Sequence, residues 1–241
     1  VVPADLSPII WTNVALLMVA AAATALIPRS SPEPEPRAEA GPVASKVRAL
    51  LKLPSFRAVI AVSALVYGSH ALFDAFAVIR WSAAGLQAPL ISALWAEAVA
   101  AEVVVFFLIG PWLLHRLGAR GAAVLAAIAG IVRWSAMGFT NSFLLLSLLQ
   151  PLHGLTFALL HLACMRVIGN VVPPTVAATA QALYAFGAGL VTAALTSLSG
   201  TLYAGYGGLA FLPMAALCVI ALPFAWWGLA NDPTVSKVGD G

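Results

Sequence analysis

Apolar stretches long enough to cross a lipid bilayer follow one another along most of the chain. A helix needs about 20 apolar residues to span the hydrocarbon core. The stretches that meet this length are Ser7–Ile27, Phe56–Trp81, Leu90–Leu114, Ala122–Phe139, Phe143–Ile168, Val176–Ser199 and Leu209–Leu229. The pattern therefore predicts an all-α, polytopic membrane helix bundle with about seven transmembrane helices.

Polar segments separate these stretches, and one of them is much longer than the rest. Residues Ser30–Ser45 are rich in Pro, Glu and Ser, a composition that cannot bury apolar surface and predicts a flexible loop. The segment Lys46–Arg57 alternates basic residues with leucines, which predicts a short amphipathic helix on a membrane face. The remaining connections are predicted to be short turns: Gly85–Pro89, His115–Gly121, Thr140–Ser142, Gly169–Thr175 and Gly200–Gly208.

The single long loop divides the predicted bundle unequally. We expect residues 1–28 to hold the last helix of a preceding bundle, and residues 29–54 to form a cytoplasmic central loop with the basic segment. Residues 55–230 would form a six-helix unit, and residues 231–241 a polar tail. The chain has no initiator Met, so we expect it to be part of a longer protein.

Composition supports the membrane class and excludes several others. Hydrophobic residues make up 62% and charged residues 9% of the chain, whereas soluble domains carry about 25% charged residues. The net charge of +3 gives no reason to expect a nucleic-acid partner. The two cysteines lie apart in apolar stretches, and no HExxH, GxSxG, P-loop or dinucleotide-binding fingerprint occurs. We therefore expect no metal, no cofactor and no catalytic residues.

Lysine and arginine positions predict how the chain is oriented in a membrane. If the long loop is cytoplasmic, Arg80 is the basic residue of the opposite side, and Arg133 lies within a span. The cytoplasmic segments then hold Arg29, Arg37, Lys46, Arg48, Lys52, Arg57, Arg116, Arg120, Arg166 and Lys237. This bias predicts a multi-pass membrane protein with the long loop and the C-terminus in the cytoplasm. We expect the membrane to be the bacterial inner membrane.

Three charged residues fall near the middle of predicted spans, where each costs roughly 2.5–3.5 kcal/mol on insertion scales. Glu97 and Glu102 lie on the third span and Arg133 on the fourth. Five residues correspond to about 140° around a helix, so the two acids cannot share one partner. Burial and a nearby arginine have opposite effects on the proton affinity of a carboxylate, so an Arg133–carboxylate pair suits proton coupling. We expect Glu102 to carry the proton, with Glu97 second; a fixed structural ion pair is the alternative.

Three histidines and an aspartate extend this set of candidates. His153 and His161 are two turns apart on the fifth span, about 80° around the helix, so both can face one cavity. His70 and Asp74 are four residues apart, a spacing that allows a hydrogen bond between them. A hydrogen bond from each histidine to a backbone carbonyl, and an interfacial position for Asp74, are the plain structural alternatives.

Trp95, Trp134 and Gln181 complete the candidate solute-binding residues. The two tryptophans lie next to charged positions, where they can stack on an organic solute. Packing within the bundle is the simpler explanation for both rings. Gln181 can line a solute path, and an interhelical hydrogen bond is the simpler explanation there.

The order of these features resembles the major facilitator superfamily of transporters. One helix, a long charged loop and six further spans are similar to the end of the first half and the whole second half of such a carrier. Several stretches together resemble the 3-phenylpropionic acid transporter group, relatives of lactose permease: GSHALFDAFAVIRWSAAGL, ALWAEAVAAEVVVFF, VRWSAMGF, LHGLTFALLHLACMRVI and ATAQALYAFGAGL. HRLGARG is similar to the loop that joins the second and third helices of each half.

The resemblance implies secondary active transport of a small organic solute, coupled to protons, with the solute bound between two six-helix halves. Arg133 and His153 match the arginine and histidine of lactose permease, but Thr156 stands where that carrier has its proton-linked Glu. Glu102 or Glu97 would then take over the proton. The expected partners are a small-molecule solute, protons, the lipid bilayer and an N-terminal six-helix half. A non-transporting membrane partner and an intramembrane enzyme are the alternatives.

Overall fold

The computed structural model describes residues 7–26 and 42–229, and within these ranges all regular structure is helical. The chain forms two units, residues 1–38 and residues 39–241. The first unit contains helix α1 (Ser7–Leu26), whose 20 residues include no charge. The structure does not test the predicted domain boundaries, which stay predictions.

The second unit begins with α2 (Val43–Lys52), the basic amphipathic helix that the sequence predicts. Leu50 is buried against the bundle, whereas Arg48 and Lys52 are exposed. Pro54 starts the next helix, where its missing N–H costs nothing.

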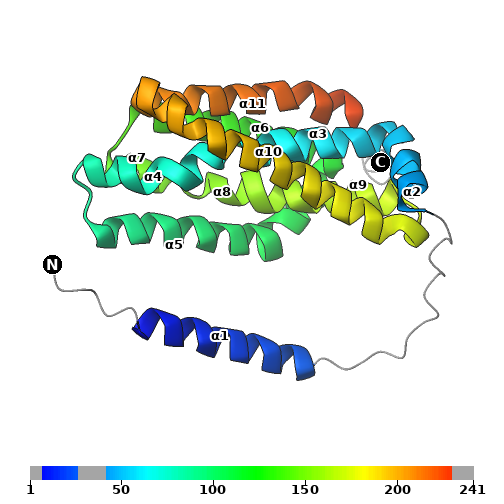
Figure 1. Ribbon diagram of the computed structural model, residues 1–241, viewed down its shortest axis with the longest axis horizontal. Helices are drawn as coiled ribbons and strands as arrows, with labels where there is room; N and C mark the ends of the chain where they lie inside the picture. The colour runs from blue at the N-terminus through cyan, green and yellow to red at the C-terminus, as the bar shows by residue number, and fades with distance from the viewer. Residues whose placement is uncertain (1–6, 27–41, 230–241) are drawn as a thin grey trace. The chain divides into compact units, whose positions relative to one another are not determined.

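From Pro54 the described chain is a bundle of helices that lie side by side (Figure 1). Its first half contains α3 (Pro54–Gly68), α4 (Ala71–Ala83), α5 (Ala88–Val104), the π-helix η1 (Val105–Ile109) and α6 (Gly110–Phe139). Its second half contains α7 (Phe143–Leu149), α8 (Leu152–Gly154), the π-helix η2 (Leu155–Leu159), α9 (Leu160–Val171), η3 (Pro174–Val176), α10 (Ala177–Tyr206), η4 (Gly207–Ala210), α11 (Phe211–Pro223) and η5 (Phe224–Gly228).

Four helical runs in the described chain are long and apolar enough to cross a membrane. These runs are Pro54–Ala83, Ala88–Phe139, Phe143–Val171 and Pro174–Gly228. Two of them contain a residue with positive φ, Gly118 (φ 65°) in one and Gly207 (φ 54°) in the other. These residues break the helical runs, so the described bundle contains more separate helical segments than the four runs. The fold class is the all-α membrane bundle that the sequence predicts.

Two predicted loops are wrong in extent. His115–Gly121 is not a seven-residue loop, because helix continues on both sides of Gly118, whose left-handed backbone alone makes the break. Gly200–Gly208 is not a turn, because α10 continues to Tyr206. Small residues in an apolar segment permit close packing as readily as they permit a turn, so composition alone did not locate these breaks.

The second predicted span is broken in the middle. The Ser69 hydroxyl donates to the Val66 carbonyl at 2.6 Å, and Nδ1 of His70 lies 3.0 Å from the same oxygen. Side chains that bond to nearby carbonyls compete with the helical ladder, so α3 ends at Gly68 and α4 begins at Ala71. The break turns the His70 ring into the bundle interior, where it is 5% exposed.

Basic residues gather at one end of the bundle. The described members of this group lie on α2, at the start of α3, beside Gly118 and near the end of α9, which are all at the same end of the helices: Lys46, Arg48, Lys52, Arg57, Arg116, Arg120 and Arg166. Arg80 lies at the opposite end, where its guanidinium donates to the carbonyls of Met137, Gly138 and Thr140 at the end of α6. Arg80 thus satisfies the carbonyls that a helix leaves unpaired at its C-terminus.

Candidate functional site

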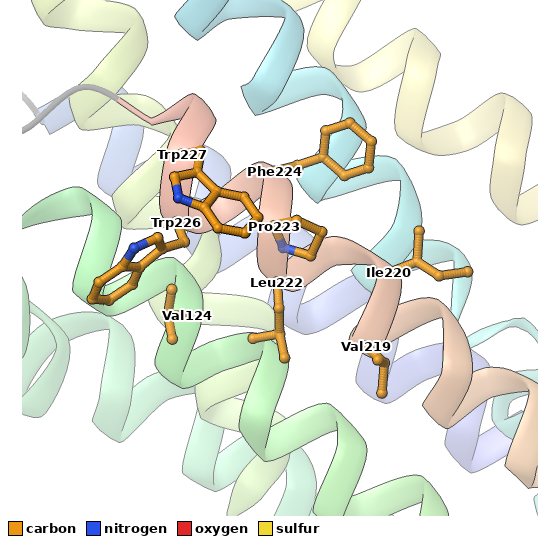
Figure 2. A pocket seen from close by; sticks show the side chains of 8 residues that line it. All are labelled: Val124, Val219, Ile220, Leu222, Pro223, Phe224, Trp226 and Trp227. Carbon is orange, nitrogen blue, oxygen red and sulfur yellow. The ribbon is translucent and has the colours of Figure 1, made fainter.

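One surface hollow of about 720 Å³ is almost entirely apolar (Figure 2). Its walls come from α6, α11 and η5: Val124, Val219, Ile220, Leu222, Pro223, Phe224, Trp226 and Trp227. No ionisable side chain lines it, so it suits hydrocarbon rather than a polar solute. We therefore place the candidate site where the ionisable residues meet.

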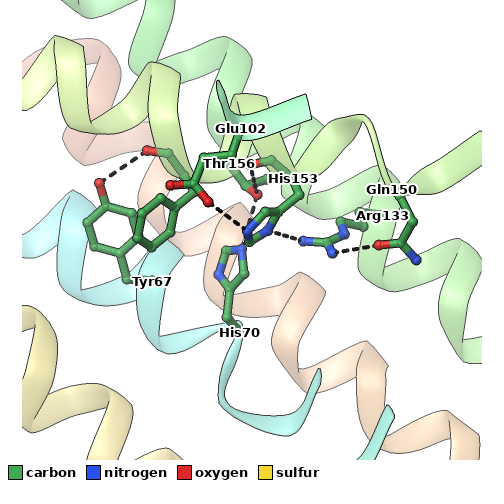
Figure 3. A network of polar contacts seen from close by, with 8 residues as sticks. Tyr67, His70, Glu102, Arg133, Gln150, His153 and Thr156 are labelled. Carbon is green, nitrogen blue, oxygen red and sulfur yellow. Dashed lines mark hydrogen bonds and ion pairs between the residues drawn. The ribbon is translucent and has the colours of Figure 1, made fainter. Parts of the chain in front are cut away.

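Arg133 lies in the bundle interior and begins a series of polar contacts (Figure 3). Its side chain is fully buried, with Nη1 2.9 Å from Nδ1 of His153 and Nη2 donating to Oε1 of Gln150 at 3.2 Å. The guanidinium carbon lies 4.6 Å from the ring centres of both Phe73 and Trp134. Aromatic faces attract a cation, so these rings stabilise the positive charge of the buried guanidinium.

His153 connects Arg133 to a carboxylate. Its Nε2 atom lies 3.5 Å from Oε2 of Glu102. Arginine nitrogens are donors only, so Nδ1 of His153 must accept, and a neutral ring then carries its hydrogen on Nε2. That hydrogen points to Glu102, and Figure 3 shows the three side chains in a row. The expected direct pairing of Arg133 with an acid is therefore replaced by a series with His153 in the middle.

The two acids of α5 have different neighbours, as their spacing predicted. Glu102 faces His153, whereas Oε1 of Glu97 accepts a 3.0 Å hydrogen bond from the Ser147 hydroxyl on α7. Oε2 of Glu97 is buried without a hydrogen-bond partner among the described residues. The Glu102 side chain is 32% exposed, so it can exchange a proton with water more readily than a closed ion pair.

A close approach of two helices brings Glu102 and His153 together. Gly154 packs so tightly on α5 that a Cβ atom there would lie 2.6 Å from the Ala101 carbonyl oxygen. His153 directly precedes Gly154 in the sequence, and Glu102 directly follows Ala101. The π-helices η1 and η2 begin just after them and contact each other. Such π turns occur frequently at functional sites.

His70 joins this cluster, but not through Asp74. Its Nδ1 lies on the Val66 carbonyl and its Nε2 lies 3.1 Å from the Thr156 hydroxyl, so the side-chain hydrogen bond that the spacing allowed is absent. Asp74 is exposed on α4. The His70 and His153 rings are 5.4 Å apart, edge to face.

His161 belongs to a second polar series, separate from His153. Its Nδ1 lies 3.3 Å from the Tyr184 hydroxyl, which lies 3.0 Å from the Tyr67 hydroxyl. Tyr67 donates in turn to the Phe157 carbonyl at 3.3 Å. The π-helix between the two histidines changes their relative rotation, so the 80° separation expected from a regular helix does not apply.

The remaining predicted residues lie in different environments. Trp134 is completely buried and its indole N–H donates to the Ser69 hydroxyl at 2.8 Å, which supports the packing explanation. Trp95 is half-buried and packs on Phe73, with ring centres 4.9 Å apart. Gln181 is exposed on α10.

Several polar residues in the two series or bonded to the other candidate residues were missed as site residues by the sequence analysis. They are Tyr67, Ser69, Ser147, Gln150 and Tyr184. Uncharged polar residues are common in membrane helices, so they carry a weak signal in sequence. The spacing Gln150–His153 places both side chains on one helical face, which is the signal that could have found Gln150.

Helices of membrane length surround a buried guanidinium, a partly buried imidazole and a partly exposed carboxylate. This arrangement defines the chain as an integral membrane protein with an internal polar site. The model of the MFS_1 like family matches residues 5–213, and the chain belongs to this family. Its resemblance to the major facilitator superfamily of transporters is thereby confirmed.

One curated relative is similar over most of this chain. It is the "Probable 3-phenylpropionic acid transporter" of Escherichia coli (strain K12), 37% identical over 164 residues. The matched region covers 68% of this chain and 42% of the relative, so the chain spans less than half the length of the protein it matches.

Proposed function

We propose that this chain is the C-terminal part of a secondary active transporter that couples the uptake of a small organic solute to protons. Family membership and the named relative support transport. An aromatic acid, a sugar and a nucleoside are the solute classes that the sequence resemblance allows. Solute and proton would reach the site from alternate sides of the membrane.

The observation that carries proton coupling is the series Arg133–His153–Glu102. Protonation of His153 at Nδ1 would break its 2.9 Å contact with Arg133 and place two cations together. The ring therefore stays neutral, and Glu102 is the member of the series that can gain and lose a proton. Glu102 is also the exposed end of the series, which gives the proton a route to water.

The orientation follows from the basic end of the bundle. We infer that this end faces the cytoplasm of a bacterial cell, at the inner membrane, because lysine and arginine favour the cytoplasmic side. Arg80 does not weigh against this orientation, because it is buried and bonded to helix carbonyls.

We also infer that the chain works with an N-terminal six-helix half. Large apolar side chains and Gln181 are exposed along α10, and Glu102 is partly exposed about midway between Ala88 and the break at Gly118. A carboxylate at this depth requires protein or water around it rather than lipid. The second candidate function is that of a non-transporting membrane partner. A transport assay on the protein expressed from the complete coding sequence would decide between the two functions.

The test of proton coupling uses the complete carrier in proteoliposomes. We expect Glu102→Gln to abolish solute accumulation driven by a pH gradient while counterflow exchange continues, because exchange needs no net proton transfer. Glu97→Gln is the matched control on the same helix and should retain accumulation. Undiminished accumulation by the Glu102→Gln carrier would remove Glu102 from the mechanism.

A further inference from the structure

The apolar hollow between α6, α11 and η5 extends inward from the basic end of the bundle. Two of its wall residues, Val219 and Trp226, are seven positions apart along one helical run, a distance of about 10 Å. Figure 2 shows Trp226 and Trp227 at one end of the hollow and Val219 and Ile220 at the other. The hollow is therefore a groove that runs along the helices.

This groove lies away from the face on which we place the N-terminal half. Glu102 on α5 and Gln181 on α10 mark that face, and neither helix contributes a wall to the groove. Figure 1 shows α5 and α11 at opposite edges of the bundle. Val219 and Ile220 are each half exposed, and the membrane core holds no water to surround them. The groove is therefore open to the bilayer, where a hydrocarbon chain can fill it.

A cation lies at the basic end of the groove. The guanidinium carbon of Arg120 is 6.0 Å from the ring centre of Trp226, which is a wall residue. Nε and Nη2 of Arg120 donate to the Leu229 carbonyl at 3.2 Å and 3.1 Å, which holds the side chain beside the groove. Nη1 has no hydrogen-bond partner among the described residues, so its two N–H groups can donate to an anion.

No carboxylate of the described chain lies at this end of the bundle. The acids within the described ranges are Asp74, Glu97 and Glu102, which belong to α4 and α5. The basic residues gathered here therefore favour an anion from outside the described chain. Tryptophans concentrate at the level of the lipid headgroups, so the rings of Trp226 and Trp227 place Arg120 at the depth of the phosphates.

We propose that this groove binds one anionic phospholipid, with an acyl chain between α6 and α11 and the phosphate on Arg120. Basic pockets between membrane helices suit anionic headgroups in this way. A zwitterionic lipid offers the same chain, but its own cation offsets the attraction of its phosphate. The site should therefore prefer an anionic headgroup. The proposal goes beyond solute transport and does not depend on it.

Quenching of tryptophan fluorescence by brominated lipid tests the proposal on the complete carrier. The protein would be reconstituted in phosphatidylcholine vesicles with increasing fractions of dibrominated phosphatidylglycerol or dibrominated phosphatidylcholine. The signal of the groove is the difference between the natural protein and the double variant Trp226→Phe, Trp227→Phe. We expect phosphatidylglycerol to half-quench this signal at an about 5-fold lower mole fraction, the effect of one basic residue near the membrane surface.

Three further variants, each measured with and without the two tryptophans, assign this preference to the groove. Arg120→Gln should reduce the ratio to about 1, whereas Arg120→Lys, which keeps the charge, should retain most of it. Arg48→Gln is the matched control, because Arg48 is exposed on α2, which forms no wall of the groove, and the ratio should not change. Val219→Phe leaves Arg120 intact and fills the groove from an exposed position, so it should weaken quenching by both lipids.

Three results would overturn the proposal. Equal quenching by the two lipids would show unselective contact with the bilayer. Quenching by neither lipid would show that protein covers the groove, either the N-terminal half or a second copy of the chain. A preference that survives Arg120→Gln would show that the phosphate does not bind Arg120.

Discussion

Replacement of Gly154 by alanine should separate the two partners at the centre of the site. The added Cβ would lie 2.6 Å from the Ala101 carbonyl oxygen and 2.7 Å from Cγ2 of Val105. Ordinary van der Waals contact begins at 3.4 Å, so the helices must move apart by up to about 0.8 Å. A backbone oxygen cannot rotate away as the end of a flexible side chain can.

This displacement acts directly on the contact between Glu102 and His153. Nε2 and Oε2 are 3.5 Å apart, and a movement of this size takes them beyond the roughly 4 Å within which such groups pair. Overpacking of this kind typically costs about 1–3 kcal/mol in stability. Alanine also favours a helix over glycine by about 1 kcal/mol, so we expect a net loss of about 0–2 kcal/mol.

Two measurements on the complete carrier check this expectation. Unfolding of the detergent-solubilised protein should begin at lower temperature for Gly154→Ala, and pH-driven accumulation should fall more than counterflow exchange. Gly189→Ala on α10 is the control, because a Cβ there meets nothing within 4 Å. If Gly154→Ala behaves like Gly189→Ala in both measurements, the close approach does not hold the site together.

Two further substitutions test contacts away from the coupling series. Arg80→Gln should reduce stability by about 1.5–3 kcal/mol, since carbonyls at the end of α6 lose a charged donor. Its control, Arg57→Gln on the exposed surface, should change the unfolding temperature little. Equal unfolding temperatures of the two variants would contradict the capping role of Arg80. Ser69→Ala should cost about 1–3 kcal/mol, because the buried indole N–H of Trp134 loses its acceptor. Ser197→Ala, which removes an exposed intrahelical hydrogen bond, is its control in the same denaturation experiment.

The apolar pattern was sufficient to predict the helices and most of their order, because membrane length is a strong constraint on sequence. It was insufficient for the breaks. Gly118 alone interrupts the helical backbone of α6. The glycines between Gly200 and Tyr206, in contrast, lie within the continuous helix α10. Which glycine adopts positive φ depends on how the neighbouring helices pack, and that information is not local.

The ionisable residues of the site were also predictable, because charges in apolar spans are rare. Their pairing was not. Regular helical geometry correctly separated Glu97 from Glu102, yet it could not place His153 between Arg133 and Glu102. The π turns and the break before His70 rotate side chains away from the positions that 3.6 residues per turn would give.

The Glu102–His153–Arg133 series contains one acid, one base and a neutral ring, which has a consequence for the response to membrane voltage. With Glu102 ionised and no solute, the charges of the series cancel. With Glu102 protonated and a carboxylate solute bound, they cancel again, so the membrane potential does no work on either form. A neutral solute would leave one uncompensated positive charge in the loaded form, worth about 2.3 kcal/mol per 100 mV across the whole membrane. The voltage dependence of uptake thus reports the charge of the solute.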